Sequence, residues 1–202
     1  MPQLVEPALP FGALRNLDQP TLKLDDGLTI RPWQPKDAEA VRTAFDCPDI
    51  QRWHVRRMDS HQEASRWIED WGYQWKGEAE ASWAIADARD DHAIGQVGLR
   101  TISLFEAHAQ LSYWMAPAAR GRGVAVQATR ALTRWSFDVL GLNRLFLQHS
   151  AGNLASCRVA EKSGYQLEGN LRQSMLHADG WHDVHLHARL RSDSRDAAKV
   201  GS

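Results

Sequence analysis

The sequence predicts an α/β fold with a mixed, mostly antiparallel sheet flanked by helices. Strand-length apolar runs alternate along the chain with segments of helical periodicity. Residues 81–87, 93–104 and 109–115 are three strand-like runs joined by short polar turns, as in an antiparallel sheet. One helix-length segment then separates the third run from the next, RLFLQH, which predicts a strand–helix–strand crossover.

The first elements are a hairpin and two helices. The runs TLKL and LTIRP flank the turn signal DDG. Residues 35–45 have helical spacing, with Val41, Ala44 and Phe45 on one face. Ser60 and Glu63 form a capping box. It opens a helix whose apolar stripe contains Trp67, Ile68, Trp71 and Trp75.

The later elements follow the loop RGRG. A helix is expected there, ending at Gly141, with one apolar face made of Val124, Ala128, Leu132, Trp135 and Val139. After RLFLQH, Asn153 caps a short helix that ends at KSGY. Two last strands, LRQSMLH and WHDVHLHARL, flank an Asp179-Gly180 hairpin turn.

The chain of 202 residues divides into an N-terminal arm, a domain and a tail. Residues 1–20 are rich in proline, residues 21–191 form the single domain, and residues 192–202 are polar. No signal-peptide pattern and no run of 18 apolar residues is found, so a cytoplasmic protein is expected. A net charge of −1 argues against a nucleic-acid or membrane partner. The alternative function is a nucleic-acid-binding module, in which RGRG and RWHVRR would form a basic patch.

The stretch RGRGVA, residues 120–125, indicates a local anion site. The first N–H groups of a helix have no partner within it, and the helix dipole favours negative charge there. Gly121 and Gly123 allow the backbone to approach a phosphate, and Arg120 and Arg122 add cationic donors. A solvated loop is the alternative interpretation. The P-loop and GxGxxG patterns are not met.

These residues resemble a known family. YWMAPAARGRGVAVQATRAL is similar to the acyl-CoA binding signature of the GCN5-related N-acetyltransferases (GNAT), especially their RimJ/RimL-like branch. NLASCRVAEKSGYQLEG resembles the second motif of that branch. The resemblance implies a sheet splayed at the cofactor site and acyl transfer to an amine from acetyl-CoA or another acyl-CoA. The cofactor-binding residues that it implies are Trp114, Met115, Arg120, Gly121, Arg122, Gly123, Val124, Ala125, Asn153, Ser156 and Lys162.

The resemblance also implies catalytic roles. The Met115 N–H would stabilise the developing oxyanion, and the Ser156 hydroxyl would donate a proton or a hydrogen bond to the leaving thiolate. The general base is unassigned, because Gln110 and Met175 replace carboxylates that relatives carry. The next candidates for the base are His54 and His149, and Glu106 in a loop.

Without a carboxylate base, an acceptor of low pKa is favoured, such as a protein N-terminal α-amine. An antibiotic, a polyamine or another small-molecule amine is the alternative, and so is a non-catalytic protein of the same fold that senses CoA. Acetyl is the usual acyl group of the family; succinyl would require a basic residue such as Arg56, Arg57 or Arg100 at the pocket. A homodimer is expected from the branch.

Two features near the C-terminus have alternative interpretations. Cys157, beside Ser156, has no activating Cys–His pair in the sequence, so direct transfer is favoured over an acyl-enzyme. His185 and His187 share one face of a strand, as zinc ligands do. With no cysteine nearby in sequence, no metal is expected.

Overall fold

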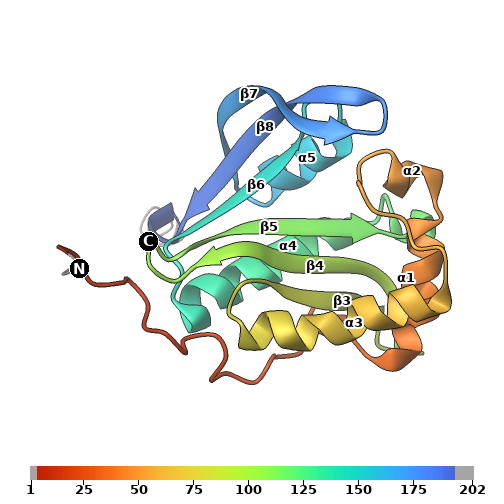
Figure 1. Ribbon diagram of the computed structural model, residues 1–202, viewed down its shortest axis with the longest axis horizontal. Coiled ribbons are helices and arrows are strands. Elements are labelled where there is room, and N and C mark those ends of the chain that lie inside the picture. The colour runs from red at the N-terminus through yellow and green to blue at the C-terminus, as the bar shows by residue number, and fades with distance from the viewer. Residues whose placement is uncertain (1–3, 194–202) are drawn as a thin grey trace.

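The computed structural model describes residues 4–193, and it is built around one twisted sheet between two layers of helices (Figure 1). The eight strands run in the order β1-β2-β3-β4-β5-β6-β8-β7. Their bounds are β1 Leu22–Lys23, β2 Leu28–Pro32, β3 Ala81–Asp87, β4 His92–Ser103, β5 His108–Met115, β6 Arg144–Ser150, β7 Gln166–His177 and β8 Gly180–Leu190. Every pair is antiparallel except β5–β6, as the sequence predicts.

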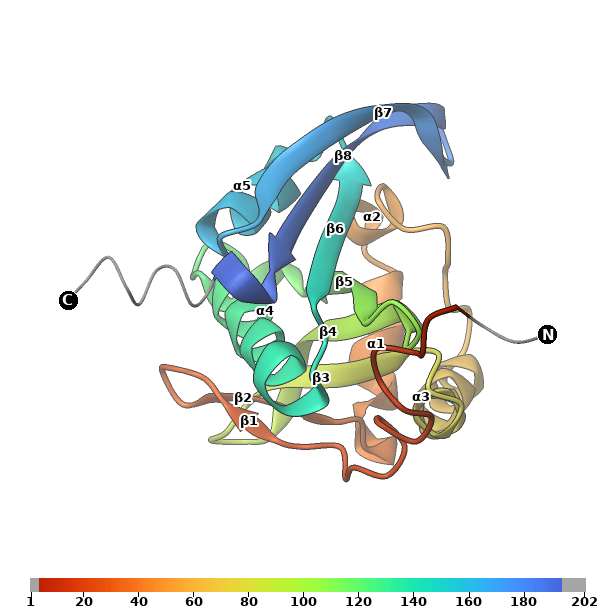
Figure 2. The same cartoon turned by 90° about the vertical axis from the view of Figure 1, so that its left-hand side faces the viewer.

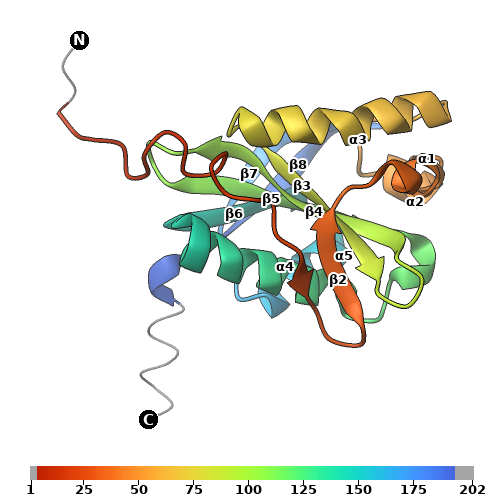
Figure 3. The ribbon, with the colours of Figure 1, turned by 90° about the horizontal axis from the view of Figure 1, so that it is seen from below.

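Helices cover both faces of the sheet. Their bounds are α1 Ala38–Phe45, α2 Pro48–Gln51, α3 His61–Lys76, α4 Val124–Trp135 and α5 Leu154–Lys162, with short 3-10 turns at Pro35–Asp37 and Pro117–Ala119. Seen from below, α1 and α3 lie on one face and α4 and α5 on the other (Figure 3). One buried cluster joins α1 and α3 to Trp114 of the sheet, and a larger one joins Leu132 of α4 to Leu99 and Leu111.

Strands β5 and β6 separate after their first residues. Only His108, Ala109 and Gln110 pair with β6, opposite Arg144, Leu145 and Phe146. Beyond them the strands diverge, and Figure 2 shows β6 and the β7–β8 pair turned away from β3, β4 and β5. This is the splay that the family resemblance predicts.

Two local features differ from the prediction. The helix after RGRG changes at Ser136 into one π-helical turn, which ends at Leu140. A wider turn rotates the following side chains about the helix axis, so Phe137 and Leu140 are buried while Val139 is exposed. Placing Val139 on the apolar face was therefore wrong. The short helix α2 was not predicted.

The described part of the N-terminal segment packs on the domain. The buried Glu78 carboxylate accepts backbone N–H bonds from Gly12 and Leu14 at 2.8 Å and from Arg15 at 3.2 Å. Leu14 is fully buried, and Trp75 donates its indole N–H to the Leu17 carbonyl. Division of the chain at residue 20 stays a prediction.

Candidate functional site

The loop 120–123 leads from β5 into α4 and presents the start of that helix. Gly121 and Gly123 both have φ of +75°, the left-handed region that glycine adopts without a Cβ penalty. A Cβ at either position would meet no heavy atom within 4 Å, so the space above the loop is open. The N–H groups of Val124, Ala125 and Val126, in the first turn of α4, have no acceptor within the helix. The arrangement fits an anion, and the negative phosphates of CoA match it.

The splayed end of β5 presents backbone groups to the gap. The Ala116 N–H donates to the Ile94 carbonyl, so the antiparallel alternation directs the N–H and C=O of Trp114 toward β4. The same groups of Met115 and Tyr113 then point to the gap beside β6. Arg120 supports this, because its Nε donates to the Met115 carbonyl at 3.1 Å. The gap-facing edge can pair with an extended chain such as the pantetheine arm, and the Met115 N–H can stabilise charge on a carbonyl oxygen.

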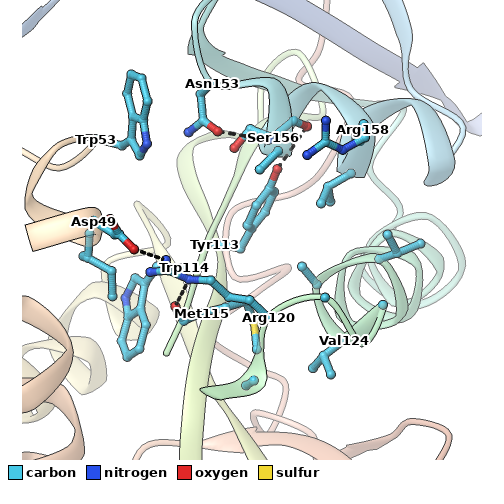
Figure 4. Close-up of a pocket in the computed structure, with 18 of the residues that line it drawn as sticks. Asp49, Trp53, Tyr113, Trp114, Met115, Arg120, Val124, Asn153, Ser156 and Arg158 are labelled. Carbon is cyan, nitrogen blue, oxygen red and sulfur yellow. Dashed lines mark hydrogen bonds and ion pairs between the residues drawn. The ribbon is translucent and has the colours of Figure 1, made fainter. Parts of the chain in front are cut away.

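A cavity of about 440 Å³ lies along this edge (Figure 4). Its walls come from β5, the 120–123 loop, α4, α5 and α2. The predicted cofactor residues that line it are Trp114, Met115, Arg120, Gly121, Gly123, Val124, Ala125, Asn153, Ser156 and Lys162. Arg122 is not among the lining residues. Arg158, which the sequence analysis did not single out, and Arg52 of the basic stretch RWHVRR add positive charge, and Asp49 holds Arg120 in an ion pair of 2.8 Å.

A second cavity, of about 290 Å³, adjoins the first. It reaches the face of the sheet under α3, where the Arg100 guanidinium lies 4.5 Å from the centre of the Trp71 ring. Six residues line both cavities: Trp53, His54, Tyr113, Trp114, Asn153 and Ser156. Acyl donor and amine acceptor would therefore meet at these six residues.

Asn153 and Ser156, to which the family resemblance assigned roles at the cofactor, both line this junction. The Asn153 side chain caps α5, because its Oδ1 accepts the Ser156 backbone N–H at 3.1 Å. That bond holds the first turn of α5 against the cavity. Ser156 lines both cavities, and donation from its hydroxyl to a leaving thiolate stays a prediction.

Tyr113 is a site residue that the sequence analysis missed. Its hydroxyl donates to the Ser156 carbonyl at 3.3 Å (Figure 4). Burial raises the pKa of Tyr113 to about 12. The phenol therefore stays protonated at neutral pH and can donate a hydrogen bond at the cavity, although the raised pKa makes it a weaker acid than an ordinary tyrosine. The available signal was its position, because Tyr113 directly precedes Trp114 and Met115, which the resemblance placed at the cofactor.

His54 lies at the junction of the cavities. Burial, and then the charges of Arg100 and Arg56, lower the pKa of His54 to about 4. The imidazole is therefore neutral at pH 7, and its ring packs edge-on against Phe45 with centroids 4.8 Å apart. It can accept a hydrogen bond from an amine, but as a proton acceptor it is weaker than an ordinary histidine.

The other two base candidates are separated by the fold, because His149 lines the second cavity and Glu106 lines neither cavity. Gln110 and Met175, which stand where relatives carry carboxylates, also line the second cavity. Burial is the largest cause that lowers the pKa of His149. Its Nδ1 faces the Ser150 carbonyl at 2.9 Å, and its buried Nε2 has no hydrogen-bond partner among the described residues.

Comparison with known proteins agrees with this geometry. The model of the acetyltransferase (GNAT) domain matches residues 27–166. YdaF of Bacillus subtilis (strain 168), whose name refers to ribosomal N-acetyltransferase activity, is 26% identical over 86% of this chain and 96% of its own. The ribosomal-protein-serine acetyltransferase of Escherichia coli (strain K12) is 30% identical over 50% of this chain and 57% of its own.

Solved structures have the same fold. A crystal structure described as a probable acetyltransferase superposes with a TM-score of 0.78 at 25% identity, covering 86% of this chain and 98% of the other. RimL, a ribosomal L7/L12 alpha-N-protein acetyltransferase in complex with coenzyme A, gives 0.76 at 18%, covering 85% and 98%. With the family model matching more than half of the chain, and the splayed sheet and the Gly-rich loop before α4 in place, the chain belongs to the GNAT family of acetyltransferases.

Proposed function

We propose that the protein transfers an acetyl group from acetyl-CoA to the α-amine of an acceptor that carries negative charge near that amine. As a GNAT enzyme it is an acetyl-CoA-dependent N-acetyltransferase. The acceptor is the part proposed. A cytoplasmic location and a homodimer likewise stay predictions, and the described residues contain no helix long and apolar enough to cross a membrane.

One observation carries the proposal: the charge of the second cavity. Among the residues that line it, Arg56 and Arg100 are cationic and none is a carboxylate. Glu80 pairs with Arg100 at 2.5 Å, whereas no acidic group among the described residues forms an ion pair with Arg56. Both arginines lower the pKa of His54, so their field reaches the reaction centre. Such a field repels a polycation and attracts a carboxylate or phosphate.

The lack of a carboxylate base supports an α-amine. A lysine ε-amine, with a pKa near 10.4, is neutral ~400-fold less often at pH 7 than an α-amine with a pKa near 7.8. The described candidates for the base are a weakly basic His54 and His149. An amine that is already partly neutral needs the least proton abstraction by these histidines. Because two relatives are named for ribosomal proteins, a peptide N-terminus is the first acceptor to test.

The test compares four acceptors by kcat/KM at pH 7.5: a peptide with acidic residues after its free N-terminus, its neutral counterpart, an Nα-blocked lysine peptide and spermidine. We expect that order of activity, with the acidic peptide at least tenfold better than the neutral one. Arg56→Gln should remove that preference. Arg57→Gln is the matched control, because Arg57 does not line the cavity and pairs with Asp59. Spermidine or the lysine peptide as the best substrate would refute the proposal.

A further inference from the structure

Four potential metal ligands converge beside the second cavity. They are His149 of β6, His185 and His187 of β8, and Cys157 of α5. One ligand atom from each lies within 4.8 Å of one ligand atom from every other. Cys157 is far from the histidines of β8 in sequence, which is why the sequence analysis expected no metal.

The sheet register and α5 bring these side chains together. His149 and His185 are direct partners on β6 and β8, and His187 follows two residues later on the same face of β8. Figure 1 shows α5 lying beside β6 and the β7–β8 pair. From α5, the Cys157 Sγ reaches to 4.0 Å from the His187 Nε2.

The hydrogen bonds of the rings direct nitrogen lone pairs into the cluster. His149 Nδ1 faces the Ser150 carbonyl at 2.9 Å and His187 Nδ1 faces the Tyr165 carbonyl at 3.4 Å. A carbonyl only accepts, so both Nδ1 atoms carry the proton and both Nε2 atoms are bare acceptors. Metal-bound histidines have this second interaction with a backbone carbonyl.

Two ring nitrogens of the cluster are buried without a partner among the described residues, His149 Nε2 and His185 Nδ1. Two of the histidines are buried: His149 is 7% exposed and His187 is 1% exposed. A buried polar atom without a partner is unfavourable, and a bound ligand would remove that cost.

We propose that His149, Cys157, His185 and His187 bind one Zn²⁺ ion. One thiolate and three imidazoles are a donor set that suits this ion, in tetrahedral geometry. Usual bond lengths place tetrahedral N and S ligands about 3.3–3.6 Å apart, so the most widely separated ligand atoms, which lie within 4.8 Å, need to close by up to about 1.5 Å. Binding displaces the thiol proton of Cys157 to solvent.

Four protein ligands make a closed site, which gives the ion a structural role. It would join α5 to β6 and β8 directly behind Ser156, the neighbour of Cys157. A bound His149 could not act as the catalytic base, which would leave His54 as the histidine at the reaction centre.

The test is a Co²⁺ titration of the untagged, chelator-treated protein. We expect one Co²⁺ per chain, with the visible bands of tetrahedral cobalt and a near-ultraviolet thiolate charge-transfer band, all displaced by Zn²⁺. Zn²⁺ should also raise the Tm. Cys157→Ser should lose the charge-transfer band, and His187→Gln should weaken binding at least tenfold.

Two controls separate the site from chance binding. Cys47→Ser removes the other thiol, and His182→Gln removes a half-buried histidine of the β7–β8 hairpin that pairs with Asp179 and is not part of the cluster. Both should titrate like the wild type. Acetyl-CoA binding and circular dichroism check that each variant is folded. Absence of the charge-transfer band in the folded wild type, or its survival in Cys157→Ser, would overturn the proposal.

Discussion

The substitution of Gly123 tests the cofactor site most directly. Gly123 has φ of +75° and is the N-cap of α4. A Cβ there meets no atom within 4 Å, so Gly123→Ala has only the cost of the left-handed conformation, about 1 kcal/mol, which lowers the Tm by about 2–4 °C in a domain of this size. If phosphate groups bind against this loop, the new side chain also obstructs them. Loss of one charge-assisted hydrogen bond, about 1.5–3 kcal/mol, weakens binding by about 10–150-fold.

Calorimetry of acetyl-CoA binding measures this effect. Gly123→Trp, whose side chain covers more of the helix terminus, should show no detectable binding while remaining folded. Gly27→Ala is the matched control: Gly27 has φ of +71°, its Cβ would also meet nothing within 4 Å, and it does not line the cavity. It should lose the same stability and keep full affinity. Unchanged affinity in a folded Gly123→Trp would refute the assignment of the loop to the cofactor.

Three other predictions concern catalysis and stability. Tyr113→Phe should lower kcat by about 10²-fold with little change in acetyl-CoA affinity, because it removes a proton donor at the cavity junction and leaves the ring in place; an unchanged kcat would exclude that role. Since the pKa of His54 is about 4, the rise of kcat/KM with pH should follow deprotonation of the amine near pH 8, and an inflection near pH 6.5 that disappears in His54→Gln would contradict this. Burial acts to raise the pKa of Glu78, but hydrogen bonds from the N–H groups of Gly12, Leu14 and Arg15 outweigh it and hold the pKa below its usual 4.5. The resulting stabilisation is present above pH 4.5 and is lost as the pH falls through the lower pKa of the folded state. Glu78→Gln should be about 2 kcal/mol less stable at neutral pH, and its Tm should fall less on acidification than that of the wild type. Equal acid dependence of the Tm in both proteins would contradict this.

Features that depend on a few neighbouring residues were predictable. RGRGVA contains within itself the positive-φ glycines and the start of α4, and Asn153 caps α5 across three residues. The periodicity of the strands and helices predicted nearly all the elements, and the motif resemblance predicted the splay. The π turn at Ser136–Leu140 was missed, because nothing in the local pattern distinguishes it from a continued α-helix.

The sequence by itself determined the class of fold, the Gly-rich loop that opens α4 and the family. Only the tertiary structure decided that Tyr113 faces Ser156, that Arg56 and Arg100 share one cavity, and that Cys157 lies on the histidines of β8. Backbone hydrogen bonding and side-chain periodicity depend on residues close together in the chain, so a short stretch of sequence is enough to predict them. These three juxtapositions depend on strand order, register and the packing of α5, which bring together residues from distant parts of the chain.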